Sequence, residues 1–381
     1  MKKSAQIAII GAGIIGASIA YHLTQRGESD IIVFDMGRPG GGSTSAALGG
    51  FRHQFSNELS VKMSLESVAT FRKFKELTGY DPLLRNDGYA FLAETENSLR
   101  QLRENVNLQK SLGVNVDSIS RQELQQTFPF YSFDPIVGGT LCTEDGHAST
   151  LAVFQGFVST AKESGVEFRE NMEVTEIEVK ENGRLSGLVA SGSKFNFQKV
   201  VIAAGAFSGR TGNLAKVSIP IIPVPRRVLV TGSFSELPAE FPLLIDIDST
   251  LAIGREGKGI IIGDNIDSKS GFEMQFPPDY DEHLLGKAVE RIPALGRASI
   301  AYGNQGLYEV TPDSNPIISS IPEVEGLFCC AGFSGHGFMH SPAAGKIMAE
   351  MLLGEKPHLD VSRLDIRRFA DASHDSERLI I

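Results

Sequence analysis

The sequence predicts an α/β protein, α+β overall, in which a Rossmann-like nucleotide-binding domain carries an inserted domain built on an antiparallel sheet. Two observations predict this arrangement. An isoleucine-rich segment near the start runs into three spaced glycines and then into an amphipathic segment, which is the order of a strand, a tight turn and a helix. Between residues 219 and 262, several β-rich runs alternate with turn signals, as is typical of an antiparallel sheet.

The first 50 residues are expected to form a βαβ unit followed by a loop. Residues 6–10 and 31–34 are apolar enough for buried parallel strands, and residues 14–25 between them have helical spacing, with Gly27 as the C-cap. Residues 37–50 are mainly Gly, Ser, Thr and Ala. Because this composition cannot pack a core, the segment is expected to form a loop that lies over another group.

The remaining elements follow from the same patterns. Helices are expected at 58–77, 98–112, 121–127, 151–164 and 343–353, and strands at 89–93, 167–168, 174–179, 200–203, 227–231, 243–247, 259–262 and 327–330. Residues 332–337 are expected to form a glycine loop. This order predicts a discontinuous nucleotide-binding domain of residues 1–85, 143–218 and 306–370, a second domain of residues 86–142 and 219–305, and a mobile tail at 371–381.

Composition limits the function classes. The 381 residues are 41% hydrophobic and 22% charged, as in a globular protein of more than one domain. The formal net charge of −10 argues against a nucleic-acid partner. The cysteines are Cys142, Cys329 and Cys330, and an adjacent pair cannot easily form a bridge, so a reducing, cytoplasmic environment is expected. No unbroken apolar stretch of about 18 residues predicts a transmembrane helix, and the glycines of the first apolar run argue against a signal peptide.

The first glycine turn predicts a dinucleotide site. Gly11, Gly13 and Gly16 form GxGxxG between a strand and a helix, where pyrophosphate can bind at the helix N-terminus. Asp35 ends the next strand and can accept hydrogen bonds from ribose hydroxyls. Because its charge would repel a 2′-phosphate, NADP is disfavoured, and FAD and NAD remain.

Two further segments favour FAD over NAD. Ser43, Thr44 and Ser45 supply small hydroxyl groups to a loop that can lie against a large cofactor. The glycine loop at 332–337 lets backbone approach a planar ring, and the dipole of the helix that follows can stabilise negative charge on a reduced flavin.

Four stretches, 8–16, 41–55, 306–316 and 331–342, resemble the D-amino-acid-oxidase-like family of FAD-dependent oxidoreductases. Within it the chain is most similar to the sarcosine oxidase and glycine oxidase group, especially the beta subunits of sarcosine oxidase and archaeal L-proline dehydrogenase. The resemblance implies a flavin domain and an antiparallel substrate domain. It also implies that an amino acid, such as the secondary amines sarcosine and L-proline, is oxidised to an imine by hydride transfer to flavin N5.

The resemblance also assigns roles to residues. Arg52, Tyr308 and His336 are the expected catalytic residues: Arg52 binds the substrate carboxylate, Tyr308 lies beside the substrate, and His336 lies over the flavin with a positioning role. A surface arginine in a salt bridge and a buried structural tyrosine remain the alternatives. His53, Met339 and Ile261 are expected to line the substrate pocket. The expected cofactor-binding residues are Gly11, Gly13, Ile14, Ile15, Gly16, Asp35, Met36, Ser43, Thr44, Ser45, Gly49, Gly50, Val174, Ala203, Ala204, Gly205, Gly332, Phe333, Gly335, His336, Gly337, Phe338 and Met339.

Departures from the family pattern refine these expectations. Gly306 and Ala46 stand where some members have the cysteine or histidine that tethers the flavin, so non-covalent FAD is expected. Met339 replaces a lysine that assists carboxylate binding. Ile261 replaces a lysine implicated in oxygen activation, which weakens the case for an oxidase and favours a dehydrogenase.

Several alternatives stay open at this point. The histidines show no metal-ligand spacing, and Cys329 and Cys330 are expected to belong to the core, so no metal site is predicted. The chain could instead be an oxidase of glycine or a D-amino acid, a flavin-bearing subunit active only in a hetero-oligomeric dehydrogenase complex, or an NAD-dependent dehydrogenase. A partner subunit, a separate electron acceptor and a homo-oligomer are all compatible with the sequence.

Overall fold

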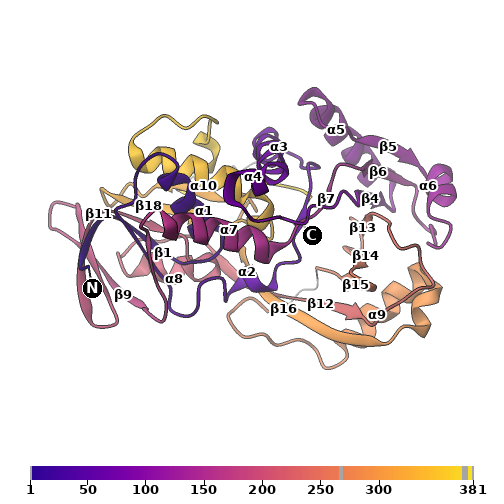
Figure 1. The fold of residues 1–381 in the computed structure, drawn as a ribbon. Coiled ribbons are helices and arrows are strands. Elements are labelled where there is room, and N and C mark those ends of the chain that lie inside the picture. The colour runs from indigo at the N-terminus through magenta and orange to yellow at the C-terminus, as the bar shows by residue number, and fades with distance from the viewer. Residues whose placement is uncertain (1, 266–268, 371–375, 380–381) are drawn as a thin grey trace.

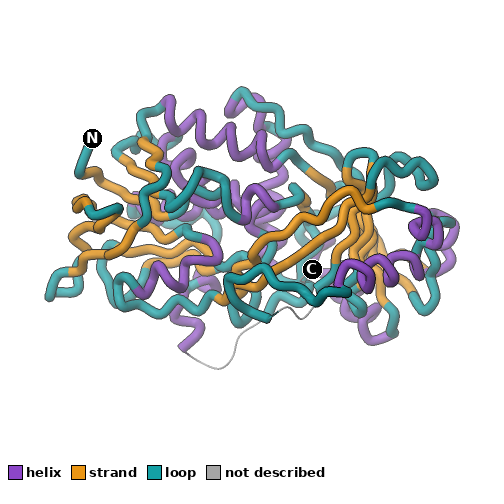
Figure 2. The backbone as a smooth tube through the Cα atoms, turned by 90° about the horizontal axis from the view of Figure 1, so that it is seen from below, coloured by secondary structure: helices purple, strands orange, loops and turns teal. Residues whose placement is uncertain are grey.

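The computed structural model describes residues 2–265, 269–370 and 376–379. It has two strand-rich regions, one at either end of an elongated molecule (Figure 2). Helices α1, α7 and α10 lie with strands β1, β11 and β18 in one region, and helices α5, α6 and α9 lie with the remaining large sheet in the other (Figure 1). The predicted fold class, α/β with a separate sheet domain, is confirmed.

The first sheet has eight strands within the described residues, in the order β17-β18-β11-β1-β2-β8 with the β9–β10 hairpin beside β11. The pairs β1–β2, β1–β11, β2–β8 and β11–β18 are parallel. The strands are β1 (Ser4–Ile10), β2 (Ile31–Phe34), β8 (Glu167–Arg169), β9 (Val174–Val179), β10 (Leu185–Ala190), β11 (Ser193–Ile202), β17 (Ile317–Ser320) and β18 (Leu327–Ala331). The sheet therefore draws strands from three separate stretches of the chain.

Both faces of this sheet are covered. Ile7 and Ile9 of β1 pack with the core residues of α1 and α10, whereas Ala8 and Ile10 point to the opposite face and pack with the β9–β10 hairpin. Cys330 belongs to the first of these clusters and Cys329 to the second. The two adjacent thiols therefore point to opposite faces of β18, as expected for neighbours on a strand.

The second sheet also has eight described strands, in the order β16-β12-β15-β14-β13-β4-β6-β5. Apart from the parallel pair β4–β13, its strands pair antiparallel. The strands are β4 (Tyr89–Ala93), β5 (Asp117–Ser120), β6 (Gly138–Cys142), β12 (Ile222–Thr231), β13 (Leu243–Asp246), β14 (Ala252–Glu256), β15 (Gly259–Gly263) and β16 (Ile300–Val310). A small third sheet pairs β3 (Gly50–Phe51) with β7 (Gly146–His147).

The helices agree with most of the sequence expectations. Residues 58–77 form two helices instead of one, because Lys73 leaves the helical conformation. The sequence analysis did not predict α9, which covers one face of the second sheet. The helices are α1 (Ile14–Thr24), α2 (Ser43–Ala46), α3 (Glu58–Arg72), α4 (Phe74–Thr78), α5 (Glu96–Ser111), α6 (Arg121–Thr127), α7 (Thr150–Glu163), α8 (Ser208–Asn213), α9 (Tyr280–Arg291) and α10 (Gly337–Leu353), with 3₁₀ turns at Gly205–Phe207, Pro293–Arg297, Ser362–Leu364 and Ile366–Ala370.

Helix α10 begins six residues before the predicted start at residue 343. The predicted helix starts directly after Pro342, and the helix in the structure includes this proline. A proline inside a helix leaves the carbonyl four residues earlier without a donor. In the structure, the Ser341 hydroxyl donates to that carbonyl, of Phe338, at 2.8 Å. The serine thus replaces the missing bond and lets the helix start at Gly337.

Two features bear on the predicted domain limits. Strand β16 runs through the expected boundary at 305–306 and remains paired with β12 up to Val310, so one strand belongs to both predicted segments. In the segment predicted to be mobile, Glu377 and Leu379 are buried, with 2% and 5% of their surface exposed. Residues 371–375 and 380–381 lie outside the described residues. Among the described helices, none is both long and apolar enough to cross a membrane.

Candidate flavin and substrate site

The GxGxxG turn has the close contacts that require glycine. Gly11 has a φ of +107°, and a Cβ there would lie 2.3 Å from the Ala203 carbonyl oxygen. A Cβ on Gly16 would lie 2.0 Å from the Gly11 carbonyl oxygen. At the start of α1, the Ile14 amide donates to the Thr44 hydroxyl at 2.9 Å. The N-terminus of this helix therefore donates a hydrogen bond to a polar oxygen, as helix N-termini commonly do.

Asp35 lies at the end of β2, beside this turn. Its carboxylate accepts hydrogen bonds from the Ala12 and Gly37 amides, both at 2.8 Å. Its backbone carbonyl accepts from the Met172 amide at 2.8 Å, which places the segment leading into Val174 of β9 next to it. Met36, predicted to contact the cofactor, is half exposed here.

The Ser43–Ala46 helix lies against β16. The Ser43 hydroxyl donates to the Leu307 carbonyl at 2.8 Å, and the Asn304 side chain donates to the Ala46 carbonyl at 3.0 Å. A Cβ on Gly306 would lie 2.9 Å from the Cβ of Ala46. The two positions at which the family resemblance implies tethering residues in other members are therefore neighbours in space.

Gly49 and Gly50 are tightly packed against protein. A Cβ on Gly49 would lie 2.0 Å from the Ala148 carbonyl oxygen, and a Cβ on Gly50 would lie 2.1 Å from the Tyr89 hydroxyl. These contacts explain both glycines without a cofactor, so their predicted cofactor role stays a prediction.

The glycine loop before α10 packs on β16. Gly332, Ser334 and Gly335 all have positive φ. A Cβ on Gly335 would lie 2.5 Å from a ring carbon of Tyr308, so the tyrosine ring rests on the loop backbone. Two residues that the sequence analysis placed in one site, Tyr308 and Gly335, are thus in direct contact.

Arg52 lies at the junction of the two domains and is only 1% exposed. Its guanidinium is 4.2 Å from the ring centre of Phe55, in the core of the first domain, and 5.3 Å from that of Phe91, on the second sheet. It donates to the Gln54 carbonyl at 2.5 Å and to the Leu379 carbonyl. Among the described residues, no carboxylate lies within ion-pair distance of Arg52, and the acceptors of its hydrogen bonds are neutral carbonyls. The buried carboxylates of Glu377 and Asp145 attract the guanidinium only from a longer range.

His336, at the N-cap of α10, lies 3.0 Å from Arg52, from its Nε2 to an Nη atom. Burial, and secondly the charge of Arg52, hold the pKa of His336 well below its usual range. The imidazole is therefore neutral at pH 7, and Nε2 accepts a hydrogen bond from the guanidinium. Burial also lowers the pKa of Arg52 and raises that of the Tyr308 hydroxyl.

His53 contacts the buried carboxylate of Asp145. Its backbone N and its Nδ1 both lie 2.7 Å from Asp145 Oδ1, and the Gln54 amide donates to the other oxygen at 2.9 Å. His53, Cys142 and Asp145 are the one group of potential metal ligands found among the described residues, with ligand atoms within 4.8 Å of one another. The 2.7 Å separation of Nδ1 and Oδ1 is a hydrogen-bond distance, which favours a His–Asp pair over shared metal ligation.

Glu309, next to Tyr308 on β16, was missed by the sequence analysis. Its Oε2 is buried and has no hydrogen-bond partner among the described residues. This oxygen lies 3.7 Å from the position of a Cβ on Gly205, and Oε1 lies 3.7 Å from that of a Cβ on Gly337. Burial raises the pKa of Glu309 to about 7. The carboxyl group thus lies between the Gly205 and Gly337 segments. A single acidic residue in a strand has no sequence pattern that predicts this placement.

The two remaining pocket predictions, Met339 and Ile261, stay predictions. Met339 is buried in the core of the first domain. Ile261 is buried on β15, where it pairs with Val230 of β12, while Tyr308 pairs with Val224 near the other end of that strand. No hydrogen bond or ring contact joins either side chain to Arg52 among the described residues.

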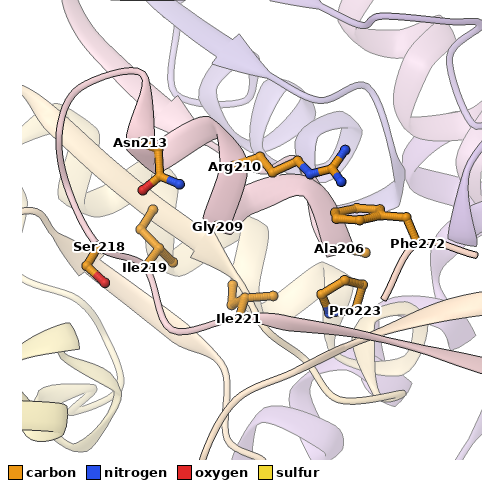
Figure 3. A pocket seen from close by; sticks show the side chains of 9 residues that line it. All are labelled: Ala206, Gly209, Arg210, Asn213, Ser218, Ile219, Ile221, Pro223 and Phe272. Carbon is orange, nitrogen blue, oxygen red and sulfur yellow. The ribbon is translucent and has the colours of Figure 1, made fainter. Parts of the chain in front are cut away.

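A hollow of about 270 Å³ opens beside α8, next to the Ala203–Gly205 segment (Figure 3). Its polar side chains include Arg210, whose guanidinium lies 3.6 Å from the ring centre of Phe272. The residues that line it do not include Arg52, Tyr308 or His336. The sequence analysis did not predict this hollow.

Comparison with known proteins decides the family. The model of the FAD dependent oxidoreductase family, DAO, matches residues 6–351. The chain belongs to this family. The FAD requirement of the DAO family and the oxidoreductase class predicted from the sequence are thereby confirmed.

Curated relatives and solved structures agree with this assignment. The chain is 24% identical over 383 residues to 4-methylaminobutanoate oxidase (formaldehyde-forming) of Paenarthrobacter nicotinovorans, covering 97% of this chain and 46% of that protein. It is 27% identical to the mitochondrial pyruvate dehydrogenase phosphatase regulatory subunit of Mus musculus, covering 97% and 44%. The chain thus spans about half the length of these relatives.

The similar structures match over nearly their whole length. The L-proline dehydrogenase of P. horikoshii superposes with a TM-score of 0.91 and 28% identity, covering 98% of this chain and 100% of that one. The glycine oxidase of Geobacillus kaustophilus superposes with a TM-score of 0.85 and 25% identity, covering 96% and 99%. The predicted group within the DAO family, which includes both enzymes, is therefore confirmed.

Proposed function

We propose that this chain oxidises an amino acid, with a secondary amine such as sarcosine or L-proline as substrate, and that Arg52 binds the substrate carboxylate. The observation that carries the proposal is the burial of Arg52 with only neutral groups in direct contact among the described residues, while Glu377 and Asp145 act on it from a longer range. A buried charge with only neutral acceptors costs several kcal/mol unless an opposite charge joins it. A substrate carboxylate supplies that charge, and the planar guanidinium can hold it through two parallel hydrogen bonds.

The residues of the DAO family's cofactor site fit FAD. The GxGxxG turn leads into the N-terminus of α1, whose Ile14 amide donates to the Thr44 hydroxyl, a place where pyrophosphate binds in dinucleotide sites, and Asp35 lies where a ribose is expected. The unpartnered Oε2 of Glu309 stands between the Gly205 and Gly337 segments, where a polar group of a cofactor can satisfy it. When bound, FAD would supply the acceptor for a hydride that leaves the substrate carbon attached to the amine nitrogen.

The chain's own residues then orient the substrate. Arg52 is held by the Gln54 carbonyl and by Nε2 of neutral His336, which fixes the direction of the guanidinium. We assign His336 a positioning role, because the lone pair that a general base would use already accepts a hydrogen bond from Arg52. Tyr308 lies on the Gly335 backbone and forms the near wall of the pocket.

We further propose that FAD is bound without a covalent link and that the enzyme reacts slowly with oxygen. The first proposal is supported by the absence of a nucleophilic side chain at Gly306 and Ala46, which face each other. The second is supported by Ile261, which offers no positive charge to a reduced oxygen species. A cytoplasmic location is proposed from three cysteines that are all free and buried.

A second candidate is a flavin-bearing subunit that acts only within a larger assembly. It is favoured by the relative named as a regulatory subunit and by the extra length of the curated relatives. Purification of the chain alone separates the two candidates, because turnover by the isolated chain would contradict an obligatory partner.

The deciding experiment is an anaerobic screen of amino acids for bleaching of the bound flavin. We expect secondary amino acids to bleach the flavin faster than glycine or D-amino acids. Each amino acid is paired with the amine that lacks its carboxylate, and the proposal fails if acid and amine bleach the flavin equally well.

A further inference from the structure

The segment 376–379, hereafter the tail segment, reaches the centre of the proposed substrate site. The Leu379 carbonyl accepts a hydrogen bond from Arg52, on the guanidinium nitrogen that also faces His336. The Leu379 side chain is buried in the apolar cluster that contains Phe91 and Ile245 of the second sheet. Leu379 thus fills the apolar side of the proposed site with its side chain and binds the Arg52 guanidinium with its carbonyl.

Glu377 anchors the tail segment. Its carboxylate accepts from the Ser56 amide at 3.0 Å and from the Asn57 side chain at 2.7 Å, and its own amide donates to the Asp313 carbonyl at 3.0 Å. The Leu379 amide closes a turn onto the same carboxylate at 3.0 Å. These bonds fix the tail segment to the loop before α3, four and five residues after Arg52 in sequence.

Little space remains around the tail segment. The cavity between Leu379, Arg378 and the walls formed by Phe91 and Ile245 has a volume of about 20 Å³. Such a volume holds about one water molecule, so Leu379 is closely packed on the side of the second sheet.

We propose that the tail segment determines substrate specificity by occupying the carboxylate position on Arg52, so that only a substrate with its own carboxylate displaces it. This inference rests on the proposed function, because it takes Arg52 as the carboxylate ligand. A neutral carbonyl makes a weaker hydrogen bond to a guanidinium than a carboxylate does, and it cannot bind in the bidentate mode. A carboxylate therefore competes successfully with Leu379, whereas an amine without one does not.

The test measures carboxylate binding with and without the tail segment. Propionate is the probe and propionamide its uncharged counterpart, and binding to the FAD-loaded protein is followed by the flavin absorbance spectrum. Two variants release the site: a chain ending at residue 375, and Leu379→Gly, which keeps the backbone but removes the apolar anchor. Glu236→Gln, an exposed ion-pair partner of Arg297 on the second domain, is the matched control.

Removal of the tail segment should tighten propionate binding at least about tenfold, because propionate no longer has to displace the segment from Arg52. Propionamide should gain by a similar factor but remain the weaker ligand, because it meets the same competitor without a charge of its own. The control should show no gain. Unchanged or weaker propionate binding in both release variants overturns the inference and makes the tail segment a fixed wall. Propionate binding that Arg52→Met leaves intact overturns the proposed function itself.

A second measurement does not depend on a variant. Arg378 is exposed and offers a trypsin site within the tail segment. Propionate should accelerate cleavage after Arg378, measured by mass spectrometry, because the displaced segment is a better substrate for the protease. Protection by propionate would show that the ligand and the tail segment bind together, which contradicts displacement.

Discussion

Replacing Arg52 by methionine separates the proposed role in binding from a role in stability. The change removes the two hydrogen bonds to the Gln54 and Leu379 carbonyls and the one to His336. Hydrogen bonds to charged groups are worth about 1.5–3 kcal/mol each. Against this loss stands the cost of burying a guanidinium without a counter-ion, which is several kcal/mol in proteins. The two contributions oppose each other, so the free energy of unfolding without substrate should fall by clearly less than the roughly 4.5–9 kcal/mol that the three hydrogen bonds are worth together.

Activity should respond very differently. A carboxylate that enters this site after the change finds no cation, and the loss of a buried charge partner costs about 3–5 kcal/mol. At about 1.36 kcal/mol per factor of ten, flavin reduction by an amino acid should fall by roughly 10²–10³·⁵ in kcat/KM. Arg52→Lys should also be impaired, because an ammonium cannot reproduce the two parallel hydrogen bonds.

The assay is the anaerobic reductive half-reaction in a stopped-flow instrument, with each amino acid compared with its decarboxylated amine, alongside urea unfolding of the same variants. The amine should reduce the variant at nearly the wild-type rate. Equal loss for acid and amine, or a large loss of stability, would mean that Arg52 supports the fold or the flavin, and the argument from its unpaired charge would be refuted.

Four other outcomes follow from the same site. Acid precipitation should release FAD into the supernatant, because Gly306 and Ala46 offer no nucleophile, and flavin retained in the pellet would contradict this. Asp35→Ala should weaken FAD binding by about 1.5–3 kcal/mol through lost charge-assisted hydrogen bonds, measured by fluorescence titration with Asp35→Asn for comparison. Ile261→Lys should speed reoxidation by oxygen in stopped-flow traces, whereas a wild-type rate in air equal to dye turnover would refute the dehydrogenase assignment. The pKa of Glu309, raised to about 7 by burial, means that the folded FAD-free protein binds a proton that the unfolded chain releases near pH 4.5. The stabilisation by that proton is complete below about pH 4.5 and is lost as the pH rises through 7, so urea unfolding should show a decline between pH 5 and 8 that Glu309→Gln removes.

Local sequence patterns were sufficient to predict the βαβ unit at the start of the first domain. The strand at 31–34, the GxGxxG turn and the helix after it depend on contacts within about 30 residues, and the structure has them where they were predicted. The start of α10 was placed six residues too late, because the helix continues through Pro342 with the Ser341 hydroxyl compensating for the missing amide. That compensation depends on a side-chain rotamer, which a sequence pattern does not specify.

The site could be predicted only in part, for a similar reason. Arg52, Tyr308 and His336 were found through motifs, and the structure brings Arg52 against His336 and Tyr308 against the loop that precedes α10. Glu309 and Leu379 belong to no motif, and each reaches the site through contacts with residues far away in the sequence. Such contacts follow from the folded arrangement, so they could not be read from spacing.

The order of strands in the first sheet has a consequence for synthesis of the protein. The outer edge of β11 at residues 200–202 pairs with β18 at residues 327–329. While the chain is being made, this edge stays open until about 127 more residues have been added. At about 5–20 residues per second, that interval lasts roughly 6–25 seconds. During it, three apolar residues, Val200, Val201 and Ile202, present unpaired backbone groups that can bind a strand of another nascent chain. Slower translation should therefore raise the fraction of insoluble protein, and a chaperone that covers exposed strand edges should lower it.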